Sequence, residues 1–126
     1  MIEGTISDQY EAIIRLSIYG PEDQHAEAEI DAIIDTGFSD CLTLPPSLLE
    51  ALDLPFEAPT LATLADGSTV TLDFHRATIQ WGDQRREVLV LAAEGGALVG
   101  VGLLRGFHLA IDFVEGGRVT IEPMKE

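Results

Sequence analysis

The sequence predicts a single all-β domain of the barrel type with one or two short helices. Short stretches in which apolar and polar residues alternate are separated by Gly, Pro and Asp turn signals, about every ten residues. The chain has 126 residues, which is enough for one domain with its own core. Because no repeat, low-complexity tract or linker divides it, we treat residues 1–126 as one domain.

Two alternating segments account for the first third of the chain. In residues 10–19 every second side chain from Ala12 onward is apolar, and a turn is expected at 20–23. Residues 26–34 alternate again. Their Ala and Glu content is also compatible with a helix, but the period of two favours a strand. This second strand ends immediately before Asp35.

One short helix is expected in the middle of the chain. Residues 41–44 are a candidate for a short strand, and Pro46 can begin a helix because its missing N–H costs nothing there. Ser47 and Glu50 have the spacing of a capping box. A loop is then expected over residues 55–59, which begin and end with proline.

The rest of the chain predicts a hairpin followed by further strands. Asp66-Gly67 is a hairpin turn signal between two apolar stretches. Residues 88–93 are apolar on both faces, which favours an interior strand. The other expected elements are strands at 61–64, 70–74, 77–81, 107–113 and 119–121 and a short helix at 103–104.

The charge of the chain excludes two classes of partner. It contains 22 acidic and 7 basic residues, giving a net charge of −15, whereas nucleic acids and anionic membranes both require a basic surface. The lone Cys41 cannot form an internal disulfide and is expected to be a small buried apolar residue. No stretch has the composition of a membrane span or signal peptide, so we expect a cytoplasmic protein.

The sequence Asp35-Thr36-Gly37 is the strongest candidate for chemistry. Two branched aliphatic residues, Ile33 and Ile34, precede it and indicate the end of a buried strand. A carboxylate at that position is costly to bury unless it is paired or hydrogen-bonded. The tripeptide alone is equally compatible with an ordinary turn after a strand.

Two further stretches of the sequence, together with Asp35-Thr36-Gly37, resemble a known protein family. Residues 33–37 resemble the active-site loop of retroviral-type (retropepsin-like) aspartic proteases, and residues 97–104 resemble that family's second landmark, where an apolar pair and a glycine precede a short helix. Residues 64–68 lie where the family has its flap hairpin. The Asp-Thr-Gly-Phe motif with residues 42–46 is most similar to a small prokaryotic branch of these enzymes.

The resemblance covers roughly residues 5–122 and implies a fold, a reaction and a partner. The fold is the closed barrel of a single-domain acid protease. Asp35 is the catalytic residue, Thr36 and Gly37 support the active-site loop, and Asp66-Gly67 is the flap. Because the chain has one Asp-Thr-Gly, the second carboxylate must come from another copy in a homodimer. The substrate is an extended peptide or unfolded protein, hydrolysed by water without a metal or cofactor.

Three residues depart from the retroviral pattern. Phe38 replaces a small residue and should either pack in the core, which we favour, or form the floor of a substrate subsite. Ser39 and Val101 stand where an acid and an arginine form an ion pair in those enzymes. An alternative is therefore a non-catalytic dimeric peptide-binding module on the same fold. Other chemistries have no support, since His25, His75 and His108 lack a metal-ligand spacing and no hydrolase or phosphate-binding motif occurs.

Overall fold

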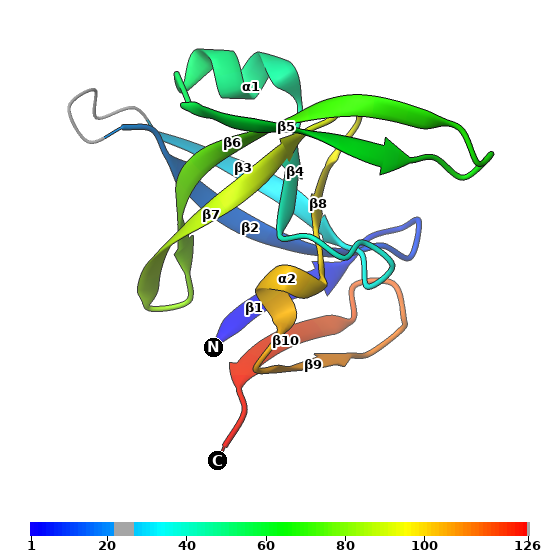
Figure 1. The fold of residues 1–126 in the computed structure, drawn as a ribbon. Helices are drawn as coiled ribbons and strands as arrows, with labels where there is room; N and C mark the ends of the chain where they lie inside the picture. The colour runs from blue at the N-terminus through cyan, green and yellow to red at the C-terminus, as the bar shows by residue number, and fades with distance from the viewer. Residues whose placement is uncertain (22–26, 126) are drawn as a thin grey trace.

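The computed structural model describes residues 1–21 and 27–125, and in this part of the chain there are ten strands and two short helices (Figure 1). The predicted all-β fold with two short helices is confirmed. In chain order the elements are β1 (Ile2–Ile6), β2 (Ala12–Tyr19), β3 (Glu27–Ile34), β4 (Leu42–Leu44), α1 (Pro46–Ala51), β5 (Phe56–Thr63), β6 (Thr69–Trp81), β7 (Gln84–Ala92), β8 (Ala97–Val99), α2 (Val101–Leu104), β9 (Phe107–Ile111) and β10 (Arg118–Pro123).

Six strands close into a barrel. Their order around the ring is β2, β3, β8, β4, β7 and β6, and β6 returns to β2 where Ile18 pairs with Ile79 and Tyr19 with Thr78. β5 flanks β6 as a free edge, and β1, β10 and β9 extend the sheet outward from β2. Most pairs are antiparallel, but β3 pairs with β8 and β4 with β7 in parallel. Closure leaves only β5 and β9 as edge strands among the described residues.

The barrel is filled by branched aliphatic side chains from almost every strand. Because successive side chains of a strand point to opposite faces, alternating apolar residues all face the interior. In β2 the inward positions are fully buried while Arg15 points to solvent. Neither described helix has the length and apolar character needed to cross a membrane. The largest fully buried side chains are Ile14, Leu16, Ile18, Leu42, Leu44, Ile79, Val90, Val99, Leu103, Val119 and Ile121.

Two expectations for the segment after β4 are wrong. The helix α1 begins at Pro46 as predicted, but Pro45 is its N-cap residue and no side chain caps it, so Ser47 and Glu50 form no capping box. The expected loop at 55–59 is instead the start of β5. Pro59 is tolerated there because β5 is an edge strand, in which a missing N–H need not interrupt the ladder.

Other boundaries also differ from the sequence-based expectation. β1 was not anticipated, and β6 is one continuous strand where two shorter ones were expected. β9 ends at Ile111 instead of continuing to Phe113, which is 65% exposed. Part of the expected turn at 20–23, together with His25 and the first residue of the 26–34 segment, lies outside the described residues.

A buried hydroxyl joins two short strands of the barrel. Thr43 in β4 is 5% exposed, and its Oγ1 accepts a hydrogen bond from the backbone N–H of Leu98 in β8 at 2.9 Å. The two residues are also paired in register, so the contact fixes β8 against β4. Because β8 lies between β3 and β4, this hydroxyl helps to hold the strand that contacts the Asp35 loop.

We predict that Thr43→Val lowers the free energy of unfolding by about 1–3 kcal/mol, because the Leu98 N–H loses its acceptor while the shape of the side chain is kept. Thr43→Ser is the matched control. It retains the acceptor and loses one methyl group, for a cost of about 0.8 kcal/mol. Urea denaturation of both variants measures the difference, and a larger loss in the Ser variant would contradict the role of the hydroxyl.

Candidate active site

The backbone of Asp35 is fixed by the strand beside it. Asp35 follows the last residue of β3, which pairs in parallel with β8 so that Ile34 lies opposite Val99. Its N–H donates a hydrogen bond to the carbonyl oxygen of Val99 at 2.9 Å. The residue is half-buried, with apolar neighbours along the strand behind it. The carboxylate is therefore held at the mouth of the barrel, where it can reach both protein and solvent.

The three residues after Asp35 form a tight turn around its carboxylate. The N–H of Gly37 donates to Oδ1 of Asp35 at 2.9 Å, and the N–H of Phe38 donates to the Asp35 carbonyl at 3.1 Å. A Cβ at Gly37 would lie 3.2 Å from the same Oδ1 and crowd it. Glycine thus allows a backbone amide to orient the carboxylate.

The second predicted stretch lies directly against this loop. Gly100 has no room for a side chain, since a Cβ there would lie 2.2 Å from the carbonyl oxygen of Asp40 and 2.5 Å from a ring carbon of Phe38. Three consecutive amides at the start of α2 donate to carbonyl oxygens of the loop: Val101 to Phe38 at 2.8 Å, Gly100 to Cys41 at 2.9 Å and Gly102 to Asp40 at 3.1 Å.

Sequence reasoning identified both stretches but missed the atoms that join them. The acceptors are the backbone carbonyls of Phe38, Asp40 and Cys41, and a backbone carbonyl leaves no residue-specific trace in a sequence. The one available signal was the pair of glycines at 100 and 102, because glycine permits such close approach.

Asp66 and Gly67 lie at the tip of the hairpin formed by β5 and β6, which projects away from the barrel (Figure 1). Gly67 has φ of +87°, a conformation that favours glycine. Oδ1 of Asp66 accepts hydrogen bonds from both the hydroxyl and the N–H of Ser68, and these lower the pKa of the Asp66 carboxyl. The hydrogen bonds of the described residues do not link this turn to the Asp35 loop.

The neighbours of Asp35 differ in exposure. Thr36 and Gly37 are exposed in the single chain. Phe38 is half-buried and does not belong to the core cluster, so the expectation that it packs in the core is wrong. Its ring instead lies against Gly100, beside the candidate site.

A hollow of about 330 Å³ adjoins the end of the Asp35 loop. Ser39, Asp40 and Cys41 line one side, and Arg86 and Arg105 are among the residues of the other. Burial raises the pKa of the Cys41 thiol, an effect that Arg86 partly offsets. Cys41 is half-buried and packs against the core from outside, so it is less buried than the sequence led us to expect.

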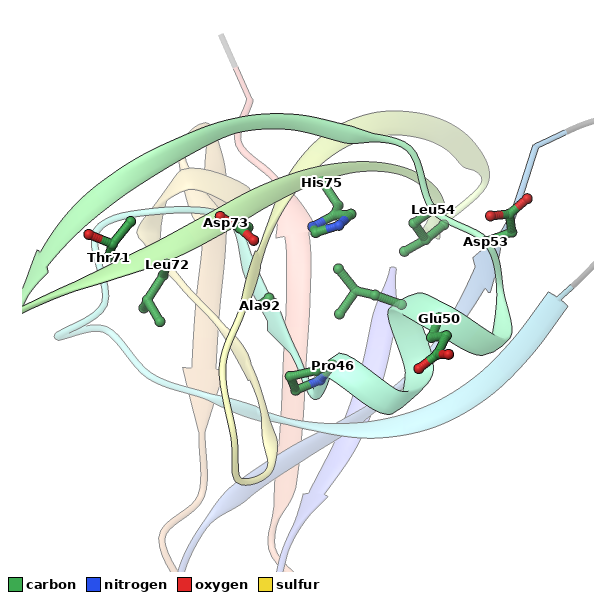
Figure 2. A pocket seen from close by; sticks show the side chains of 10 residues that line it. Pro46, Glu50, Asp53, Leu54, Thr71, Leu72, Asp73, His75 and Ala92 are labelled. Atoms are coloured by element: carbon green, nitrogen blue, oxygen red, sulfur yellow. The ribbon is translucent and has the colours of Figure 1, made fainter.

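A second hollow, of about 460 Å³, lies between α1 and β6 (Figure 2). Glu50, Asp53, Asp73 and His75 line it together with apolar side chains, and none of its lining residues comes from the Asp35 loop. Within residues 1–21 and 27–125, no group of three or more His, Cys, Asp and Glu side chains is placed to hold a metal ion.

Comparisons with known proteins identify a family and a fold. A family model described as aspartyl protease matches residues 22–106. The fold is similar to the crystal structure of a retropepsin-like aspartic protease from Rickettsia conorii, with a TM-score of 0.58 over 98% of this chain and 91% of that chain. The sequences are 14% identical, so this likeness concerns the fold alone. No curated protein sequence gives a significant match.

We predict that Gly100→Ala lowers the free energy of unfolding by about 1–3 kcal/mol, because the added methyl group must displace the loop that follows Asp35. Gly96→Ala is the control in the same segment. The nearest atom to its added Cβ is Cδ1 of Ile33 at 3.9 Å, an ordinary contact, so the change should stay within about 0.5 kcal/mol. Thermal unfolding compares the two, and equal losses would show that Gly100 is not a point of close approach.

Proposed function

This chain belongs to the aspartyl protease family, and from that premise we propose that it is a homodimeric aspartic endopeptidase whose catalytic residue is Asp35 of each subunit. The observation that carries the proposal is the fixed, half-buried carboxylate of Asp35, held by the Val99 carbonyl and the Gly37 amide. The sequence contains this Asp-Thr-Gly once, so one chain supplies one carboxylate of this kind.

A two-fold axis beside Asp35 completes the site. In an isologous dimer each Asp35 meets its own copy, and the flanking residues do the same. The exposure of Thr36 and Gly37 in the single chain supports this arrangement, because residues that brace two loops against each other are open until the second loop arrives.

The pair of carboxylates supplies both an acid and a base. Two carboxylates at close range cannot both ionise, so one keeps a proton that the pair shares. The ionised Asp35 accepts a proton from a water molecule as the water attacks the scissile carbonyl carbon. The protonated Asp35 donates its proton to the carbonyl oxygen, and collapse of the tetrahedral intermediate transfers a proton to the leaving amine.

The β5–β6 hairpin supports an extended peptide as substrate. Its tip at Asp66-Gly67 is held by Ser68 and projects beyond the barrel (Figure 1), as expected for a flap that closes over a bound strand. Backbone hydrogen bonds to an extended peptide would hold it without requiring one sequence. Unfolded protein segments can adopt this extended conformation, whereas folded proteins rarely expose a segment that does.

One observation bears on the alternative of a non-catalytic peptide-binding module. Ser39 and Val101 cannot form the ion pair found at these positions in the retroviral enzymes that the sequence resembles. However, the N–H of Val101 still joins the two segments by donating to the Phe38 carbonyl. Since the loop is supported without the ion pair, its loss does not by itself argue against catalysis.

We predict that mixing wild-type chains with Asp35→Asn chains reduces activity as the square of the wild-type fraction. The isosteric amide should preserve the fold and the dimer, so subunits exchange freely, but a mixed dimer lacks the shared proton. Peptide cleavage is measured at fixed total protein, with Asp31→Asn as a control on the exposed side of β3 that should leave activity unchanged.

The shape of this curve separates the possibilities. A linear decrease means that one Asp35 suffices, and the dimeric mechanism is then wrong. No cleavage at any ratio, with peptide binding retained by the Asp35→Asn chain, indicates the binding module.

We also predict that a statine-type peptide inhibitor slows amide hydrogen exchange over residues 64–70. Closure of the hairpin over the ligand should protect amides that a free hairpin tip exposes to solvent. The turn at Gly82-Asp83, which joins β6 to β7, is the internal control and should exchange at the same rate in both states. Unchanged exchange at the hairpin tip in a demonstrably occupied protein would remove the flap assignment.

A further inference from the structure

Three large apolar side chains are exposed on two neighbouring loops. Tyr10 is 60% exposed in the loop between β1 and β2, and Phe113 and Val114 are 65% and 61% exposed in the loop between β9 and β10. We call these three residues the loop patch. The other exposed large apolar side chains of the described residues are on the β5–β6 hairpin, at Leu89 and near the two termini.

Backbone hydrogen bonds hold the two loops side by side. The N–H of Ile6 donates to the carbonyl of Gly117, and the N–H of Gly116 donates to the carbonyl of Ile6, both at 2.9 Å. The first loop is closed by the N–H of Ser7, which donates to the Glu11 carbonyl at 2.9 Å. The two loops that carry the loop patch therefore lie next to each other at the end of β1 and the start of β10.

The strand register places the loop patch at the same end of the molecule as Asp35. Ile6 pairs with Ala12 at the start of β2, and the next residue of β2, Ile13, pairs with Ile33 near the end of β3. The loops after β1, β3 and β9 all lie on one side in Figure 1, whereas the N and C termini lie on the other.

The exposed side chain of Tyr10 is carried by a backbone conformation that is energetically unfavourable. Tyr10 has φ of +61°, a left-handed conformation that is unfavourable for a residue with a Cβ, and its N–H is tied to the Ser7 carbonyl at 3.0 Å. Gly117 has no space for a side chain, since a Cβ would lie 1.9 Å from the carbonyl oxygen of Asp112. Among these loop residues the unfavourable backbone conformation belongs to Tyr10, and such conformations concentrate at functional sites.

We propose that the loop patch is the contact through which this chain binds a second copy of itself. The inference rests on the proposed function, because a two-fold axis beside Asp35 brings both copies of the adjoining loops to the interface. Aromatic side chains such as those of Tyr10 and Phe113 are enriched at the centre of such contacts. In this reading the interface is built from loops, whereas the retroviral enzymes that the sequence resembles use interleaved terminal strands.

β1 and β10 leave no free edge on which the strands of a second copy could interleave. β1 already pairs with β2 along one edge and with β10 along the other. The register that pairs Ile2 with Ile121 and Thr5 with Arg118 puts the first and last residues at the end away from Asp35. A second copy docked near Asp35 meets the loop patch and not the termini.

The surroundings of the loop patch make the association dependent on salt. Asp8 and Glu11 lie in the first loop and Asp112 and Glu115 in the second, and all four are exposed. In an isologous contact these like charges approach their own copies and repel. Because salt screens exposed charges, the dimer should tighten as ionic strength rises.

The test compares the double variant Phe113→Ser/Val114→Ser with the control Met124→Ser. Met124 is equally exposed, at 61%, but lies after β10 at the opposite end from the patch. Sedimentation equilibrium of each full-length chain in 50 mM and 500 mM NaCl gives the dimer dissociation constant. We expect it to increase roughly 100-fold in the double variant and to stay unchanged in the control, because each substitution occurs twice in a two-fold interface.

The outcomes separate this inference from the proposed function. A double variant that dimerises as tightly as wild type overturns the patch, while the Asp35→Asn mixing curve can still support the dimeric protease. The patch is also overturned as a dimer contact if the double variant dimerises normally but binds peptide more weakly, because the patch would then contact the substrate. A dimer that weakens with added salt contradicts the isologous placement of the acidic residues. A wild-type chain that remains monomeric in both salts, alone and with inhibitor, overturns both proposals.

Discussion

The parallel pairing of β3 with β8 is the constraint on which the candidate site depends. It aligns Ile34 with Val99, and the same alignment lets the Asp35 amide reach the Val99 carbonyl. One residue later, Gly100 brings the start of α2 against the loop that follows Asp35. The pairing joins segments more than sixty residues apart, and its position is maintained by the closed barrel, since β8 is held on its other side by β4 and the Thr43 hydroxyl. Carboxylate, loop and helix are thus placed by backbone contacts.

This dependence explains what the sequence could and could not reveal. Alternation in β2 and β3 reports which face is buried, so strands ending just before Asp35 were predictable from residues alone. Which strand pairs with which leaves no comparable local signal in the sequence. Pro59 indicated a loop because its position on an edge strand could not be known in advance. The spacing of Ser47 and Glu50 suggested a capping box, but the N-cap position belongs to Pro45, whose side chain has no acceptor. The residues alone identified Asp35-Thr36-Gly37 and the Asp66-Gly67 turn, but their connection with residues 97–104 came from the resemblance, which carries information on non-local pairing that periodicity lacks.

The end of the barrel that carries Asp35 differs from the rest of the surface in what it exposes. The core of the chain is well buried, and most of its acidic residues are on the surface, where they favour solubility. At the end that carries Asp35, however, Thr36 and Gly37 are exposed and apolar side chains stand on neighbouring loops. A stable monomer gains nothing from displaying a large apolar side chain in the conformation of Tyr10. These features have a common cause if a second copy covers this end, and they require separate explanations if it does not.

Phe38 shows how the loop can be supported by different means from those of the retroviral enzymes that it resembles. An ion pair between side chains fixes two segments only if both members are present, so Ser39 and Val101 are best understood as a joint replacement. What remains is the hydrogen bond from the Val101 amide to the Phe38 carbonyl, together with the contact of the Phe38 ring with Gly100. Glycine at position 100 leaves room for this ring, because a Cβ there would overlap it. The half-buried position of Phe38 follows from this contact, because the ring lies against the start of α2 and not in the core cluster.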